Sequence, residues 1–173
     1  EMCIRDSIHS APVKSVKTNT QGIVDLLVRS DYVCNLVEED PISELEQTIP
    51  APKLKTNYHY VVIDIKFTTL PLRTDAIHIV NTGNMAAYKA QCFVYNQIVG
   101  EIQGYTPPYA FLIGRRWRCT RNGILHTGNN CLARFGKINY DDVDIQYRQR
   151  TQDAIQWVRD VKTKSNGWTT HPP

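Results

Sequence analysis

Two charged residues inside an apolar run are the first candidates for chemistry in this sequence. Residues 58–67 are YHYVVIDIKF, in which Asp64 and Lys66 stand among aromatic and β-branched residues. Such residues favour a largely buried strand, in which side chains two positions apart point the same way. Asp64 and Lys66 therefore share one face of the predicted strand. One interpretation is a solvent-exposed face with two ordinary surface charges, and the other is a catalytic acid beside a lysine.

A second acid and a polar helix face favour the catalytic interpretation. Asp25 ends the strand-like motif GIVD, and Gln91 and Tyr95 lie one turn apart on a helix predicted after the second strand. Hydrolysis of a phosphodiester needs a nucleophile made from water at neutral pH and stabilisation of transition-state charge, and Mg²⁺ supplies both. Mg²⁺ is typically held by one or two carboxylates. Asp25 and Asp64, on neighbouring strands, can meet at such an ion.

The order of these motifs resembles that of a known nuclease group. GIVD, DIK and QCFVY match the GxxD, (D/E)xK and QxxxY motifs of the RecB-like branch of the PD-(D/E)xK nuclease superfamily, which includes the YqaJ viral recombinases. Each motif is short, so their shared order over residues 20–115 carries the resemblance. It implies an α/β fold with a restriction-endonuclease-like core, a central mixed β-sheet flanked by helices. It also implies a deoxyribonuclease that uses Mg²⁺ or Mn²⁺.

The resemblance assigns roles to individual residues. The residues that it places in catalysis are Asp25, Asp64, Lys66, Gln91 and Tyr95. Asp25, Asp64 and the backbone carbonyl of Ile65 are expected to bind the metal. Lys66 is expected to orient the attacking water or to stabilise developing negative charge. The matching glutamine and tyrosine of the family face the active site and hold the lysine or a substrate phosphate, whereas we interpret Tyr88 as a half-buried aromatic residue.

The sequence departs from the family pattern in two respects. Many relatives carry a further acidic or histidine ligand on a helix before the GxxD strand, and too few residues precede Gly22 for that helix. His9 is a poor substitute, so we expect weaker metal affinity than in a full-length protein. The five cysteines are widely and irregularly spaced. This spacing predicts reduced, mostly buried thiols and no iron–sulfur cluster.

A basic segment supplies candidate nucleic-acid contacts. Arg115, Arg116, Trp117 and Arg118 form the densest basic cluster, with Arg121 close by. Guanidinium groups bind phosphates and an indole can stack on bases, which suits single-stranded or frayed DNA. An equally simple interpretation is a strand edge protected by charges.

Composition limits the class of protein. The chain has 173 residues, 42% of them hydrophobic, and a formal charge of +3. This is enough for one domain with a real core, and the mild basicity permits a polyanionic partner without requiring one. No apolar run is long enough for a membrane span and no signal peptide opens the chain. We therefore expect a soluble, intracellular protein with no membrane partner.

The two ends of the chain suggest an incomplete protein. The opening residues EMCIRDS resemble translated adapter sequence, so we leave them out of the fold prediction. Residues 1–19 are expected to be an N-terminal extension that is partly artefactual or truncated, and residues 20–173 a single nuclease-like domain. Since the chain stops just after a helix-like segment, we expect a fragment of a longer protein that has further domains.

Hydrophobic periodicity and turn residues predict the elements that position these motifs. The expected elements are a strand or hairpin over residues 22–37, a loop with one helical turn in ISELEQ, a strand over 59–68, a helix over 85–99, a strand over 109–120 that turns at Asn122–Gly123 into ILHT, and a helix over 144–164. In the 85–99 helix, the buried face is predicted from Ala87, Ala90, Val94 and Ile98. Asn84 is expected to cap this helix and Gly100 to end it.

The sequence favours one function and leaves two alternatives. The leading hypothesis is a metal-dependent deoxyribonuclease, exonuclease-like, that works in recombination, repair or viral DNA processing. The first alternative is a catalytically silent nucleic-acid-binding module of the same fold, although the intact Asp25, Asp64 and Lys66 argue against it. The second is an RNA-directed nuclease, because the phosphate chemistry is identical.

Overall fold

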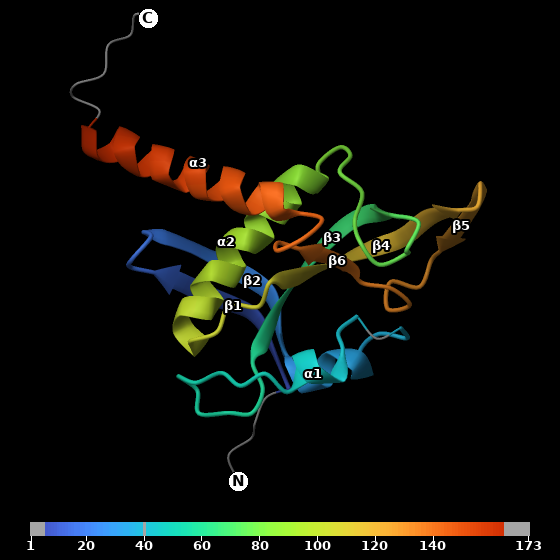
Figure 1. The fold of residues 1–173 in the computed structure, drawn as a ribbon, viewed down its shortest axis with the longest axis horizontal. Helices are drawn as coiled ribbons and strands as arrows, with labels where there is room; N and C mark the ends of the chain where they lie inside the picture. Colours follow the sequence, from blue (N-terminus) through green and yellow to red (C-terminus); the bar gives the residue numbers. More distant parts are fainter. Residues whose placement is uncertain (1–5, 40, 165–173) are drawn as a thin grey trace, which may run out of the picture.

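The protein folds around one open, mixed sheet. The computed structural model describes residues 6–39 and 41–164. Its elements are β1 (Ser7–Ser15), β2 (Thr20–Arg29), the 3₁₀ helix η1 (Ser30–Asn35), α1 (Glu44–Gln47), β3 (Tyr60–Leu72), α2 (Met85–Gln103), β4 (Tyr109–Arg121), β5 (Ile124–Gly128), β6 (Gly136–Asn139) and α3 (Ile145–Lys164). The strand order is β1-β2-β3-β4-β5, and β6 also pairs with β4. The predicted α/β class with a central mixed sheet is therefore confirmed (Figure 1).

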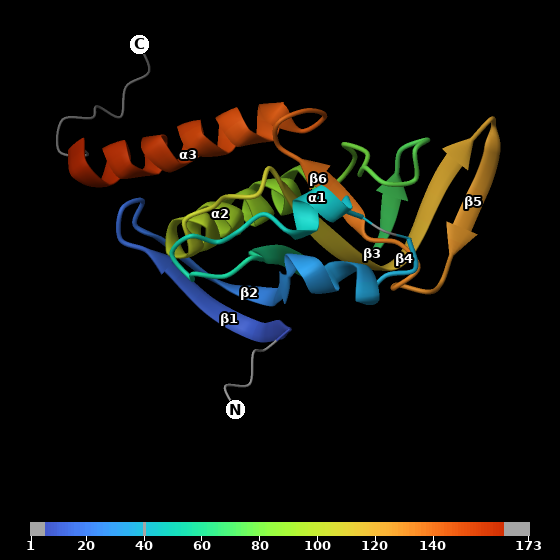
Figure 2. The same cartoon turned by 60° about the horizontal axis from the view of Figure 1, so that its bottom comes forward.

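The sheet contains a single parallel pair. β3 and β4 are parallel and are connected through α2, whereas the other neighbouring strands are antiparallel. A parallel pair needs such a crossover connection. Helix α2 packs across β1 to β4, and α3 lies on the outer side of α2 (Figures 1 and 2). No helix in the described ranges is long and apolar enough to cross a membrane.

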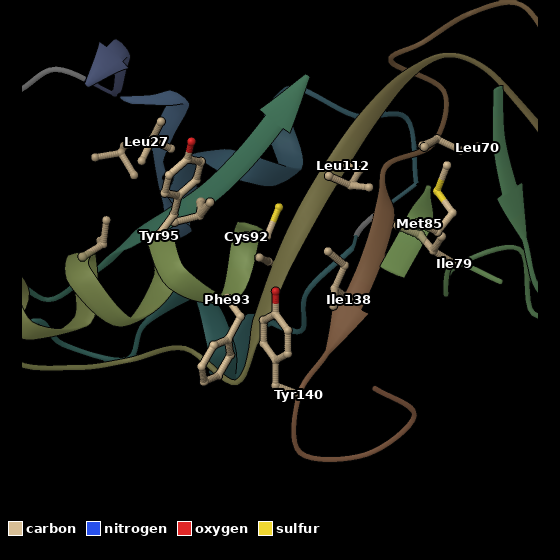
Figure 3. Packing of buried hydrophobic residues seen from close by; sticks show 14 of the residues in the cluster. Leu27, Leu70, Ile79, Met85, Cys92, Phe93, Tyr95, Leu112, Ile138 and Tyr140 are labelled. Atoms are coloured by element: carbon tan, nitrogen blue, oxygen red, sulfur yellow. The ribbon is translucent and has the colours of Figure 1, made fainter. Parts of the chain in front are cut away.

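Each face of the sheet has its own hydrophobic core. The larger core lies under α2 and contains Cys92, Phe93, Tyr95, Leu112, Ile138 and Tyr140 (Figure 3). The second core joins the opposite face to the segment that follows β2, through Val33, Val37 and Ile42. In β3, Val62 belongs to the first core, whereas Val61 and Ile63 belong to the second. This alternation is the period of two expected for a strand covered on both faces.

The segment after β2 is not the strand or hairpin that we predicted. The strand ends at Arg29, whose guanidinium binds the carboxylates of Asp31 and Asp6. The hydroxyl of Ser30 then donates to the backbone carbonyl of Gln47. These contacts turn the chain into η1, so the Val-rich continuation packs as a short helix against the second core.

Helix α2 is longer than predicted and buries a different face. It continues past Gly100 to Gln103 and ends at Gly104, which has a left-handed backbone with φ 82°. Gly100 lies inside the helix, and its lack of a side chain leaves room for Thr106, whose side chain packs where a Cβ of residue 100 would stand. Asn84 occupies the N-cap position without a side-chain cap hydrogen bond. The residues that α2 buries include Lys89, Cys92, Phe93, Tyr95, Asn96, Ile98 and Val99, whereas Ala87 is exposed.

Several other elements follow the prediction. The helical turn in ISELEQ is α1, which begins with a capping box between Ser43 and Glu46. Asn122 and Gly123 both have positive φ and connect β4 to β5, as a two-residue hairpin turn requires. The final helix is α3. In contrast, β3 continues to Leu72, through residues predicted as a loop, and residues 7–15 of the proposed N-terminal extension form strand β1 on β2.

A buried ion pair connects α2 to the start of α3. The Lys89 ammonium lies 2.5 Å from the Asp144 carboxylate, and both side chains are 0% exposed. Lys89 also donates to the carbonyl of Ile79 and to the side chain of Asn81. The other Asp144 oxygen accepts from the backbone of Asn139. Because each charge has several partners, this pair fixes the junction between the helices without leaving either charge unpaired.

Replacing one partner of this pair should strongly destabilise the fold. We expect Lys89→Met to lower the free energy of unfolding by about 3–5 kcal/mol, because Asp144 would remain buried and uncompensated. The double variant Lys89→Met with Asp144→Asn should recover much of that loss. The matched control is Arg148→Met, since Arg148 and Asp141 form an exposed pair (49% and 56%) expected to contribute ~1 kcal/mol or less. Chemical denaturation measures all three, and equal losses for Lys89→Met and Arg148→Met would contradict the interpretation.

Candidate active site

The candidate site lies where strands β2 and β3 stop pairing. Their ladder begins at Arg29 and Tyr60 and ends at Leu26 and Ile63. The next backbone donor of β3, the N–H of Ile65, is not bonded to the β2 backbone. It donates instead to the Asp25 side chain, with 2.7 Å between nitrogen and Oδ2. This hydrogen bond replaces a ladder bond with a side-chain contact and holds the carboxylate of Asp25 beside β3.

Asp64 is buried, so the solvent-exposed interpretation of this residue is wrong. Only 1% of Asp64 is exposed, and its Oδ2 makes no hydrogen bond with acceptable geometry. That oxygen lies 2.5 Å from the Lys66 ammonium, which is therefore an electrostatic contact more than a directed hydrogen bond. Lys66 is half-buried, and its ammonium lies 5.1 Å from the centre of the Tyr88 ring. The acid and the lysine thus pair on the face of β3 that α2 covers.

The two acids influence each other's ionisation. Burial raises the pKa of Asp64; the contact with Lys66 lowers it, and the nearby carboxyl of Asp25 raises it again, with a net upward shift. Burial disfavours the Lys66 ammonium, but the contact with Asp64 outweighs it and raises the pKa of Lys66. A buried carboxyl group whose charge is opposed by a second carboxyl, with a lysine beside it, is typical of functional sites.

Helix α2 supplies the other wall of the site. Cys92 is fully buried, and its pKa is raised by burial and by the charge of Asp64, so it is a neutral thiol packed against the acids. Figure 3 shows Cys92 and Tyr95 projecting from α2 toward the sheet. Gln91 donates to the Tyr95 hydroxyl at 2.8 Å. Sequence analysis had treated the cysteines only as buried apolar residues and did not place Cys92 here.

The glycine of GIVD has a packing role that links two motifs. A Cβ at Gly22 would overlap the ring of Tyr95. The absence of a side chain therefore lets α2 approach β2 closely enough for Tyr95 to lie buried over the strand. Gly22 and Tyr95 come from the first and third motifs, so these motifs are in direct contact.

The two carboxylates suit a divalent cation. Asp64 has a buried oxygen without a hydrogen bond, and Asp25 raises the pKa of Asp64, a repulsion that a cation would relieve. Within residues 6–39 and 41–164, no group of three or more His, Cys, Asp or Glu side chains could hold a metal. Mg²⁺ commonly uses one or two carboxylates and completes its shell with waters and substrate oxygens. Two carboxylates are within the number that Mg²⁺ commonly uses.

The apolar residues that alternate with Asp64 and Lys66 are exposed, which reverses the expected burial of this strand. Ile65 is 50% exposed and Phe67 is 86% exposed. The guanidinium of Arg115, on the adjacent strand β4, lies 4.8 Å from the centre of the Phe67 ring. The alternation of side chains along a strand predicts which residues share a face. Whether that face is buried depends on which other elements of the fold cover it.

The predicted nucleic-acid contacts lie on strand β4. Arg115, Arg116 and Arg118 are exposed, and Arg116 and Arg118 lie opposite Thr69 and Pro71 of β3. Trp117 is only partly exposed. Its ring packs where a Cβ of Gly128 would stand, and Arg134 lies 4.9 Å from the ring centre. The arginines are thus more available to a ligand than the indole is.

Comparison with known proteins assigns no family to this chain. No protein-family model and no curated protein sequence matches this chain. The resemblance to RecB-like nucleases therefore depends on the three motifs and on the contacts among them.

Removing the charge of Asp64 should stabilise the protein in the absence of metal. The folded state raises the pKa of Asp64 above its unfolded value near 3.8, so the ionised carboxylate costs stability. This free-energy cost is complete at pH values above the pKa that Asp64 has in the folded state. It disappears at pH values below the pKa that Asp64 has in the unfolded state. We expect Asp64→Asn in EDTA to raise Tm at pH 8 by a few degrees, since 1 kcal/mol moves Tm by ~2–4 °C in a domain of this size. The gain should vanish near pH 4.

Asp75 provides a control, because the same substitution there should change Tm in the opposite direction. Burial opposes ionisation there, but hydrogen bonds from Ile77 and His78 dominate and lower the pKa of Asp75. Its ionised form therefore stabilises the fold, so Asp75→Asn should lower Tm at neutral pH, and the difference should fade as pH falls. Scanning calorimetry of both variants across pH measures the two signs. A lower Tm for Asp64→Asn at pH 8 would contradict the predicted cost of this carboxylate.

Proposed function

We propose that this protein is a metal-dependent nuclease that hydrolyses DNA phosphodiester bonds. The observation that carries the proposal is the buried acid Asp64, which is paired with Lys66 and close enough to the half-buried Asp25 for that carboxyl to raise its pKa. A protein that needed only stability would rarely keep an acid at 1% exposure whose charge a second acid opposes, because burying an ionised group is costly. The order of the GxxD, (D/E)xK and QxxxY motifs supports the same chemistry, and a restriction-endonuclease-like core is part of the proposal.

Each residue of the site has a physical task in this proposal. Asp25, fixed by the Ile65 N–H, and Asp64 would hold Mg²⁺ or Mn²⁺, together with the Ile65 carbonyl that the family resemblance adds. The bound ion would lower the pKa of a water molecule and stabilise charge on the phosphate. Lys66 keeps its proton because Asp64 raises its pKa, so it can donate hydrogen bonds to a water or to a phosphate oxygen.

Gln91 and Tyr95 are proposed to position substrate or Lys66. Their mutual hydrogen bond fixes the Tyr95 hydroxyl, and the contact of Tyr95 with Gly22 fixes its ring. A rigid pair of this kind positions a phosphate more accurately than a mobile side chain would. The arginines of β4 would bind flanking phosphates, which contributes affinity without sequence specificity.

Two other functions of the same site remain to be separated by experiment. A catalytically silent nucleic-acid-binding module is favoured by the absence of a third acidic or histidine ligand near the two acids in the part of the chain that the structure describes. An RNA-directed nuclease would use the same residues. A role in recombination, repair or viral DNA processing, and the intracellular location that it implies, belong to the proposal as well.

Charge removal at Asp64 should separate cleavage from binding. We expect Asp64→Asn to lower Mg²⁺- or Mn²⁺-dependent cleavage of labelled linear DNA by ~100-fold or more, since even outer-shell changes at metal sites cost ~10–100-fold. Affinity for DNA in EDTA should hold or rise, because an acid that repels phosphate is removed. Asp153→Asn, an exposed helix residue that makes the same change of charge, should leave cleavage unchanged.

The same assay distinguishes the alternatives. Single-stranded DNA, double-stranded DNA and RNA are offered to one preparation with Mg²⁺, with Mn²⁺ and with EDTA. Preference for RNA would identify an RNA-directed nuclease, and binding without cleavage in either metal would identify a silent module. Wild-type rates of cleavage by folded, contaminant-free Asp64→Asn would refute the proposed active site.

A further inference from the structure

We propose that Phe67 is a base-stacking residue, so that the substrate of this site is single-stranded or frayed DNA with an unpaired base next to the bond that is cut. The inference rests on the proposed nuclease function and adds the substrate class. Phe67 follows Lys66 directly and is 86% exposed, the largest exposed fraction among the large hydrophobic residues of the described chain. The Phe67 ring contacts the Arg115 guanidinium and belongs to neither hydrophobic core, so core packing does not explain a phenylalanine beside Lys66.

Phe67 is three positions after Asp64 on β3. Consecutive Cα atoms are about 3.8 Å apart, and nucleotides in a stacked strand are spaced by about 3.4 Å. In the proposal, a base next to the phosphate at Asp64 and Lys66 crosses the edge of the strand and stacks on the ring of Phe67. A paired base in the interior of a duplex does not, because its faces are already covered by adjacent base pairs.

The edge of β3 provides a path for such a strand. On the β2 side of β3, the ladder ends at Ile63, and the next backbone pairing in the described part of the chain is the isolated bridge between Leu72 and Ile79. Asp64 and Lys66 point to one face of β3, whereas Ile65 and Phe67 point to the other. A polynucleotide that crosses this free edge can present its phosphate to the acids and lysine and its base to the exposed face.

Charge complementarity favours nucleic acid over a protein partner. Arg115 stacks on Phe67 at 4.8 Å, and Arg116 and Arg118 are exposed further along the same strand. Guanidinium groups next to an aromatic ring are the combination that binds single-stranded nucleic acid, through phosphate contacts and stacking. Trp117 is less suited to this role because its ring already contacts Arg134 and the backbone at Gly128.

Stacking can be measured without cleavage. Short single-stranded DNA oligonucleotides carrying one 2-aminopurine are titrated with the whole chain in EDTA, because stacking on an aromatic side chain changes the fluorescence of that base. We expect Phe67→Ala to weaken binding by about 5-fold or more and to abolish the fluorescence change, and Phe67→Trp to retain both. Ile124→Ala, which changes a 62%-exposed hydrophobic residue on β5, is the matched control and should change neither.

An abasic substitution tests the contact directly. Removing the base that stacks should weaken wild-type binding, and it should weaken Phe67→Ala binding much less, because that variant has already lost the contact. Blunt duplex DNA should bind wild type and Phe67→Ala equally.

Three results would overturn the stacking role. They are unchanged oligonucleotide affinity and fluorescence in Phe67→Ala, equal abasic losses in the two proteins, and an absence of single-strand binding by the wild type. An exposed ring that serves a protein partner would give the first of these results. If the Phe67 effects appear but no metal supports cleavage, the nuclease proposal fails and the stacking role stands.

Discussion

The early end of the β2–β3 ladder is the constraint on which the candidate site depends. If pairing continued past Leu26 and Ile63, the N–H of Ile65 would bond to the β2 backbone. Because the strands separate, that N–H is free to bind Asp25, and this bond holds the carboxylate next to Asp64. The same separation leaves an edge of β3 unpaired beside the acids. One local irregularity in a regular sheet thus produces both the pair of carboxylates and an approach to it.

Two pairs of a buried acid and a lysine in this protein differ in how completely their polar atoms are hydrogen-bonded. Lys89 has three acceptors, and Asp144 accepts a backbone hydrogen bond as well as the ammonium. Asp64, in contrast, keeps one buried oxygen without a hydrogen bond and lies close to a second acid. Buried polar groups are normally satisfied, so an exception calls for a ligand or for chemistry. The raised pKa of buried Asp64, next to a second acid, is the kind of perturbation that clusters at functional sites.

The sequence predicted the helices and strands more accurately than it predicted where they end and which of their faces are buried. A run of β-branched and aromatic residues identified β3, a mixed apolar and basic segment identified β4, and the Asn122–Gly123 pair identified the hairpin, because these signals are local. The end of β2 was missed because it depends on Ser30 contacting Gln47, which lies far along the chain. The buried face of α2 was misplaced because small residues such as Ala87 fit either environment. The candidate site residues were predicted from motif order, whereas the exposure of Phe67 was not predicted, because an aromatic residue in an apolar run normally packs in a core.

The reversed burial of β3 follows from how far each face is covered. On one face, α2 spans the strand, so Asp64 lies under Cys92 and is protected from solvent. On the other face, the segment that contains η1 and α1 covers β3 only as far as Ile63, and Ile65 and Phe67 extend beyond it. A strand with a period of two thereby places charges in a low-dielectric layer and an aromatic ring in water. This arrangement is opposite to the one that hydrophobicity alone favours, and it suits the nuclease that we propose, acting on an unpaired strand. In that proposal Asp64 acts from a low-dielectric layer, where its charge has a strong effect, and the Phe67 ring lies on an open surface that a base can reach.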